Sequence, residues 1–174
     1  MNFPARRLRF AGEVAYRELG EPMVKNAGDA VLIVRGRPRA MLLACPDGCG
    51  ETLVVNLDSR AGKAWRLDMR GEGPTLYPSV WRDGGCESHF IVWRGSILWC
   101  GRYLSGNEEP DRSEGLEEKV LDALDARTPR SVEELATLLD ENIWDVDRAV
   151  TSLVQEGEAI LRKTSLDRLF LLDR

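Results

Sequence analysis

The sequence has very few of several residue types that define common protein classes. Of its 174 residues, one is histidine and four are cysteine. No apolar run approaches the roughly 20 residues that cross a bilayer as a helix, and the first residues lack the apolar core of a signal peptide. Excess positive charge is also absent, because the net charge is −5. We therefore expect a cytoplasmic protein with no membrane partner and no nucleic-acid partner.

What is present indicates a globular protein with two unlike parts. Hydrophobic residues make up 43% and charged residues 30%, which is typical of folded domains. Residues 1–112 carry a net charge of +2 and residues 113–174 a net charge of −7, and the histidine and all four cysteines lie in the first part. Residues 105–115 are polar and rich in turn formers. We predict domains at 1–104 and 115–174, joined by a linker at 105–114.

The first part has the pattern of a β-rich domain. Its apolar runs are each about one strand long, rich in β-branched or aromatic residues, and separated by turn signals such as Gly36-Arg37-Pro38 and Arg94-Gly95. The runs are residues 30–34, 40–44, 52–57, 88–93 and 96–100. No stretch sustains a helical period over three turns. A small sheet or barrel is the expected architecture.

The second part has the element order of a winged helix, which gives an α+β protein overall. Apolar residues at helical spacing predict three helices; Ser131 and Glu134 form a capping box at the start of the second, and Gly157 ends the third. The inward apolar side chains would be Leu116, Val120, Leu121 and Leu124, then Leu135, Leu138 and Leu139, then Val146, Ala149, Val150, Leu153 and Val154. Two apolar runs, 159–161 and 169–172, would form the hairpin.

DNA binding through the third helix is the obvious role for a winged helix, but the charges oppose it. Residues 144–156 hold Asp145, Asp147 and Glu156 against the single cation Arg148. A helix that enters the major groove needs cations for the phosphates and donors for the base edges. We therefore expect this domain to dock a protein.

The four cysteines predict one metal site. Cys45 and Cys49 are separated by three residues, Cys86 follows after 36 more, and Cys100 follows after 13. Four thiolates suit a tetrahedral structural Zn²⁺, and adjacent glycines let backbone amides approach a thiolate. Alternatives are disulfides, which are rarer in the cytosol, buried cysteines with no ligand, or a mixed site in which His89 replaces one cysteine.

The single histidine, His89, is the candidate general base. If residues 75–81 and 88–94 pair as neighbouring strands, Ser79 and His89 approach across the sheet. Ser88 is adjacent in sequence but points to the opposite face of a regular strand. A neutral imidazole within about 3 Å of a serine hydroxyl can remove its proton. The alternative is that His89 has no catalytic role and is only a hydrogen-bonded structural residue.

A carboxylate or carbonyl usually orients such a histidine. Glu87 and Asp83 are the nearest candidates in the sequence.

Residues 28–101 resemble a bacterial family long catalogued as a domain of unknown function. The motifs that carry the resemblance agree in order and spacing, and those around residues 76–80 and 86–100 are the most specific. They are Gly28-Asp29-Ala30, Arg39-Ala40-Met41, Cys45-Pro46-Asp47-Gly48-Cys49-Gly50, Val55-Asn56-Leu57, Trp65, Leu76-Tyr77-Pro78-Ser79-Val80, Cys86-Glu87-Ser88-His89-Phe90-Ile91-Val92 and Gly95-Ser96-Ile97-Leu98-Trp99-Cys100.

The resemblance implies a zinc-containing serine peptidase of bacterial ubiquitination-like (Bub) operons, which trims or releases a ubiquitin-like protein. Of the residues in its motifs, Ser79, Ser88 and His89 are the catalytic candidates. The family often has a further cysteine where this chain has Asp47, which leaves the four cysteines as the ligand set. The expected partners are a ubiquitin-like protein or its activating and conjugating enzymes.

We therefore expect a peptidase with Ser79 as nucleophile and His89 as general base, or with Ser88 as nucleophile if the strand is interrupted there. One alternative is a non-catalytic zinc-binding adaptor that docks partners through its winged helix. Another is a zinc hydrolase in which His89 and fewer cysteines hold a metal with an open position for water.

Overall fold

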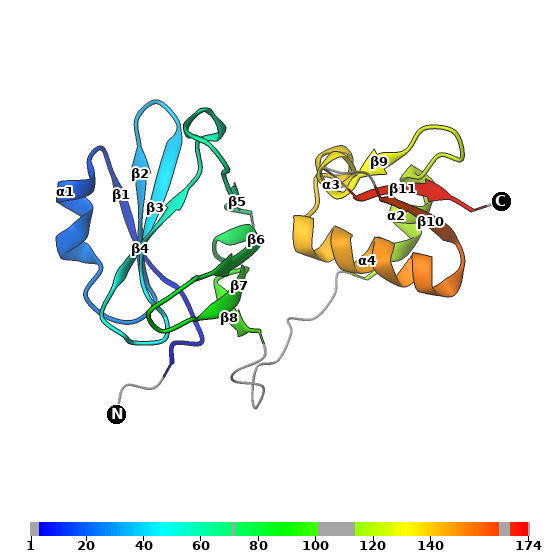
Figure 1. Ribbon diagram of the computed structural model, residues 1–174. Helices are drawn as coiled ribbons and strands as arrows, with labels where there is room; N and C mark the ends of the chain where they lie inside the picture. The colour runs from blue at the N-terminus through cyan, green and yellow to red at the C-terminus, as the bar shows by residue number, and fades with distance from the viewer. Residues whose placement is uncertain (1–3, 71, 101–113, 164–167, 174) are drawn as a thin grey trace. The chain divides into compact units, whose positions relative to one another are not determined.

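Strands dominate the first part of the chain and helices the second (Figure 1). The computed structural model describes residues 4–70, 72–100, 114–163 and 168–173. The chain divides into two compact units, Met1–Glu109 and Pro110–Arg174. The mixed α+β class is thereby confirmed, whereas the predicted linker lies outside the described residues except for Glu114.

The described residues of unit 1 form two four-stranded sheets. In the first sheet β1 pairs parallel with β2, and the remaining pairs are antiparallel. The second sheet is antiparallel throughout. In sheet order, the strands are β1 (Arg9–Val14), β2 (Asp29–Val34), β3 (Pro38–Ala44) and β4 (Thr52–Asn56), then β5 (Arg66–Asp68), β6 (Thr75–Trp81), β7 (His89–Trp93) and β8 (Ser96–Trp99).

The apolar runs 30–34 and 40–44 become strands whose residues are buried on both faces. Ala30 and Leu32 of β2 enter a core shared with Phe90 and Val92 of the second sheet. The intervening residues of β2 enter a smaller core on the opposite face, with Leu42 and Ala44 of β3. Burial on both faces explains why these runs are continuously apolar rather than alternating.

Short helical turns cover the smaller core. They are α1 (Arg17–Gly20) and the 3₁₀ turn Glu21–Met23; a second 3₁₀ turn spans Ser59–Ala61. Gly20 lies so close to the sheet that a Cβ there would be 2.7 Å from Val31 Cγ1 and 2.9 Å from Leu42 Cδ1. Glycine is therefore the residue that lets this turn pack against β2 and β3.

In the part of unit 2 that the structure describes there are three helices and a three-stranded sheet in the order β10-β11-β9. The capping box at Ser131 is present, and Gly157 ends the last helix in the left-handed conformation. Leu135 is buried as expected, whereas Leu138 is 56% exposed. The elements are α2 (Leu116–Ala123), β9 (Arg130–Ser131), α3 (Val132–Leu139), α4 (Ile143–Glu156), β10 (Ala159–Lys163) and β11 (Arg168–Leu172).

None of the helices in the described ranges has the length and apolar content needed to cross a membrane.

Candidate functional site

Antiparallel pairing of β6 with β7 brings Ser79 next to His89. Trp81 lies opposite His89 and Val80 opposite Phe90, and the register is irregular between Leu76 and Val80. Ser79 Oγ lies 3.0 Å from His89 Nε2. The strand pairing and the Ser79–His89 approach expected from the sequence are both present.

This hydrogen bond places a hydroxyl against the imidazole nitrogen that would accept its proton. Ser79 and His89 are both half-buried, so that they remain accessible from solvent. When Nε2 carries no proton, it accepts the Ser79 hydroxyl hydrogen, which is the geometry of a nucleophile and its base. The arrangement is chemically able to activate Ser79.

The other surroundings of His89 are aromatic rather than acidic. The Trp81 ring centroid lies 5.8 Å from the imidazole centroid, with 32° between the ring planes. Within the described parts of the chain, neither Asp83 nor Glu87 forms a hydrogen bond with His89. The two carboxylates suggested by sequence proximity are therefore not in the orienting position here.

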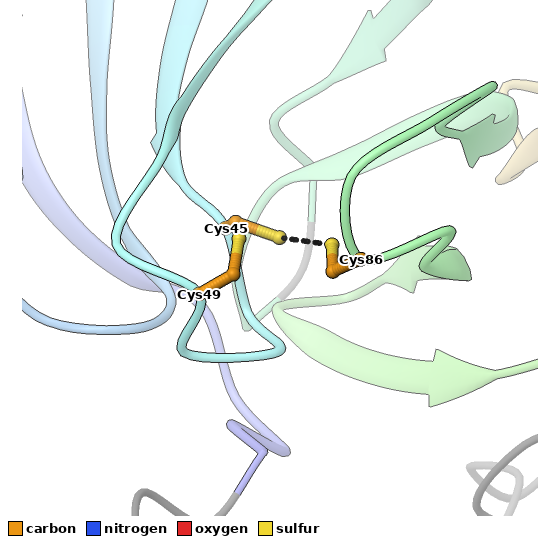
Figure 2. A group of neighbouring side chains, drawn as sticks. All are labelled: Cys45, Cys49 and Cys86. Atoms are coloured by element: carbon orange, nitrogen blue, oxygen red, sulfur yellow. Dashed lines mark hydrogen bonds between the residues drawn. The ribbon is translucent and has the colours of Figure 1, made fainter.

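Three of the four cysteines gather at one end of unit 1. The Sγ atoms of Cys45, Cys49 and Cys86 all lie within 4.8 Å of one another. Figure 2 shows Cys45 and Cys49 on the loop after β3 and Cys86 on the loop between β6 and β7, with the Cys45 and Cys86 sulfurs directed toward one another at 3.6 Å. The group therefore joins the first sheet to the second.

The spacing of the three thiols fits a thiolate-bound metal. Zn–S bonds of about 2.3 Å in tetrahedral geometry place sulfurs about 3.8 Å apart, close to the observed Cys45–Cys86 distance. All four cysteines are free thiols. Cys100 is not in the group; its backbone N–H donates to the His89 carbonyl at 2.9 Å. The four-cysteine ligand set stays a prediction.

Ser88 belongs to the cysteine group. It is fully buried, and its Oγ lies 3.5 Å from Cys45 Sγ and 3.3 Å from Cys86 Sγ. Burial opposes ionisation of Cys86, but hydrogen bonds from the Ser88 hydroxyl and backbone outweigh it and lower the pKa of Cys86 to about 7. Burial raises the pKa of Cys45 to about 11. One thiol of the pair is thus favoured as a thiolate.

Arg82 also contacts the cysteine group, although the sequence analysis did not identify it as a candidate. Its Nη1 lies 3.2 Å from Cys86 Sγ and 3.5 Å from Cys49 Sγ, and its Nη2 pairs with Glu51. A guanidinium beside the Cys86 sulfur favours the ionised form of that thiol. No spacing pattern marks Arg82 in the sequence, because its role depends on how two loops meet.

A known protein family matches the first part of the chain. Residues 19–100 match the BubE family model, described as bacterial ubiquitination-like system serine protease. This confirms the family resemblance of the sequence motifs. No curated protein and no solved structure matches the chain.

The BubE match covers both groups of candidate residues. Ser79 and His89, Ser88 and the four cysteines all lie within residues 19–100, whereas unit 2 lies beyond the matched segment. The matched segment thus associates the strands that carry the Ser79–His89 hydrogen bond with a serine protease family. It also contains the cysteine group that could bind a metal ion.

Proposed function

We propose that unit 1 is a peptidase domain that cleaves at the C-terminal tail of a ubiquitin-like protein, with Ser79 as nucleophile and His89 as general base. The observation that carries the proposal is the 3.0 Å contact between Ser79 Oγ and His89 Nε2. The BubE match supports the same class of chemistry.

The proposed reaction moves one proton through His89. Nε2 takes the proton of the Ser79 hydroxyl while Oγ forms a bond to the scissile carbonyl carbon, and the carbonyl oxygen becomes an oxyanion. The tetrahedral intermediate collapses, the C–N bond breaks, and His89 returns the proton to the leaving amine. Water, activated by the same imidazole, then releases the acyl group from Ser79.

Ser79 is preferred to Ser88 as nucleophile because of their environments. Ser88 is fully buried and its hydroxyl contacts two thiols rather than an imidazole. Ser79 is half-buried and contacts His89. A substrate carbonyl would therefore reach Ser79 without opening the core.

We infer that Cys45, Cys49 and Cys86 hold a structural zinc ion, with Cys100 the sequence-based candidate for a fourth ligand. Zinc is favoured because thiolates are soft ligands. When bound, it supplies a rigid cross-link rather than a reacting group. The loop that carries Cys86 connects β6 to β7 directly, so fixing that loop also fixes the strands that bear Ser79 and His89.

Unit 2 is proposed to be a winged helix that docks the substrate or a partner enzyme. Its three helices precede the β10–β11 hairpin, and β9 pairs with β11. On α4, Asp145 is buried and Asp147 accepts a hydrogen bond from Arg168 at 2.9 Å. Arg148 is the single cation in the α4 sequence, too few for contacts with a phosphate backbone, which supports a protein partner over DNA.

The first test is hydrolysis of a co-encoded ubiquitin-like precursor. Replacing either Ser79 or His89 by alanine is expected to reduce kcat/KM at least about 100-fold, because the nucleophile or its base is lost. Ser59→Ala is the matched control, since Ser59 is an exposed serine in a 3₁₀ turn away from β6 and β7. Wild-type activity in both Ser79→Ala and His89→Ala would contradict the Ser/His mechanism.

A fluorophosphonate probe tests the nucleophile without requiring the substrate. The serine Oγ forms a bond to phosphorus and fluoride leaves. Mass spectrometry of the labelled peptide is expected to place the adduct on Ser79, with none in Ser79→Ala. An adduct on Ser88 would instead support the alternative nucleophile. Partner capture without probe labelling or hydrolysis would favour the zinc-binding adaptor.

A further inference from the structure

Four arginines gather around one carboxylate at the turn between β2 and β3 (Figure 1). Arg60 donates to both oxygens of Asp58, at 2.8 and 2.9 Å. Arg39 Nη1 donates to Asp58 Oδ2 at 2.6 Å, and Arg37 Nη2 lies 3.6 Å from Asp58 Oδ1. The Arg35 carbonyl accepts from the Arg39 guanidinium. We call these four residues, with Asp58, the arginine cluster.

The positive charge of the arginine cluster exceeds what its carboxylate balances. Within the described parts of the chain, Asp58 is the one carboxylate that pairs with these arginines. It is already held bidentately by Arg60, so the other guanidinium groups add like charges that repel one another. The side chains of Arg37 and Arg60 are 49% and 59% exposed. An anion from outside would relieve the repulsion and accept hydrogen bonds from their N–H groups.

Two exposed apolar side chains extend this surface at α1. The Arg35 guanidinium carbon lies 6.0 Å from the centroid of the Tyr16 ring. Tyr16 is 57% exposed and Leu19 is 58% exposed, and their spacing of three residues places them on one side of the turn. Glu18 is one or two residues from each of them, and residues at that spacing do not face each other on a helix. The surface therefore combines excess positive charge with apolar area.

We propose that the arginine cluster, with Tyr16 and Leu19, is a docking surface for an acidic segment of a partner protein. Carboxylates of that segment pair with the guanidinium groups, whose planar forks match them, and an apolar side chain between them packs on Tyr16 and Leu19. Arginine and tyrosine are the residue types enriched at such interfaces. Protein is preferred to nucleic acid because phosphates would engage the cations and leave Leu19 without a partner.

The test measures binding of the full chain to a fluorescein-labelled peptide in which Asp and Glu alternate with Leu. Wild type is expected to bind it, and binding should weaken as salt is added, because exposed ion pairs are screened. Arg37→Glu combined with Arg60→Glu should raise the Kd at least about tenfold. Tyr16→Ala combined with Leu19→Ala should raise the Kd for this peptide but not for one in which Ser replaces Leu.

The matched control combines Arg7→Glu with Arg162→Glu, which changes the net charge by the same amount at two exposed arginines outside the cluster. It should keep the wild-type Kd. A milder variant, Arg37→Ala, removes only the 3.6 Å ion pair and keeps the hydrogen bonds of Asp58. It should retain the wild-type thermal unfolding transition and still raise the Kd for the peptide.

The inference involves none of the residues of the proposed active site, so it stands or falls separately from the proposed function. No peptide binding by wild type, or equal losses in the cluster variant and in the control, would overturn the docking surface. A single-stranded oligothymidine that binds more tightly than the peptide at the same salt, and is released by Arg37→Glu with Arg60→Glu, would overturn the choice of a protein partner.

Discussion

At the scale of single residues, the Asp29 carboxylate holds the start of β2 in place through hydrogen bonds to β1 and to the preceding turn. Its Oδ1 accepts from Arg9 Nε at 2.7 Å, and its Oδ2 accepts from the backbone N–H groups of Lys25 and Asn26 and from the Asn26 side chain. Burial raises the pKa of Asp29, but hydrogen bonds from Asn26 and Arg9 outweigh it, so the pKa lies below its usual range. The carboxylate thus connects β1 to the turn before β2.

Asp29→Asn is expected to destabilise unit 1 at pH 7 by about 1–3 kcal/mol, because charge-assisted hydrogen bonds are weakened. A lowered folded-state pKa contributes stability above the unfolded pKa of about 3.9, and this contribution is lost as pH falls through the folded value. Urea unfolding should therefore show a smaller difference from wild type at pH 3 than at pH 7. The control is Glu13→Gln on exposed β1; equal losses at both pH values would contradict the ionic role.

The candidate site was partly predictable at this scale. The side-chain period of two placed Ser79 and His89 within reach if their strands paired, and the pairing brings them together. Local spacing did not reveal that Ser88 turns toward the thiols or that Arg82 reaches two of them. Those contacts depend on the path of the loop between β6 and β7.

At the scale of elements, the strands that could be predicted are those with an apolar run or a glycine turn in their own sequence. Apolar runs and glycine turns predicted β2, β3, β4, β7 and β8. β1 was not predicted, because all of its residues are exposed or half-buried and no continuous apolar run marks it in the sequence. β5 has only three residues, too few for any period to be read.

The α3 capping box provides an element-scale prediction. Glu134 N–H donates to Ser131 Oγ at 3.2 Å, and Ser131 N–H donates to Glu134 Oε2 at 2.8 Å. Ser131→Ala is expected to destabilise unit 2 by about 1 kcal/mol, since the Glu134 N–H loses the Ser131 Oγ acceptor. The measurement is thermal unfolding of the full chain. Ser152→Ala within α4 is the matched control and should be near neutral; equal effects of both would contradict the cap.

At the scale of the whole molecule, the two units are expected to respond separately to the metal. The reference is protein in zinc at a free concentration about a thousandfold above the Kd of the site. Relative to that state, removing the metal with a chelator should lower the free energy of unfolding of unit 1 by about 4 kcal/mol. Calorimetry of the full chain should show one transition moving on chelation and another moving in Ser131→Ala.

Cys86→Ser serves as the control for this experiment, because it removes one of the three grouped thiols. It should abolish the response to chelator while leaving the transition assigned to unit 2 in place. Simultaneous movement of both transitions, or none, would contradict a metal site confined to unit 1.

The two faces of the first sheet have a consequence for how this domain tolerates changes in chain length. Successive residues of β2 enter different cores, Leu32 the larger and Val31 the smaller. Inserting or deleting one residue within β2 would exchange the contents of both cores at once, because every later side chain changes face. Both faces of β2 pack against apolar cores, so a shifted strand would still bury its apolar side chains. The shift would be destabilising because the side-chain volumes would no longer match the space in each core. Relatives that share this sheet should therefore conserve the length of β2 and β3 more strictly than the identity of any one apolar residue in them.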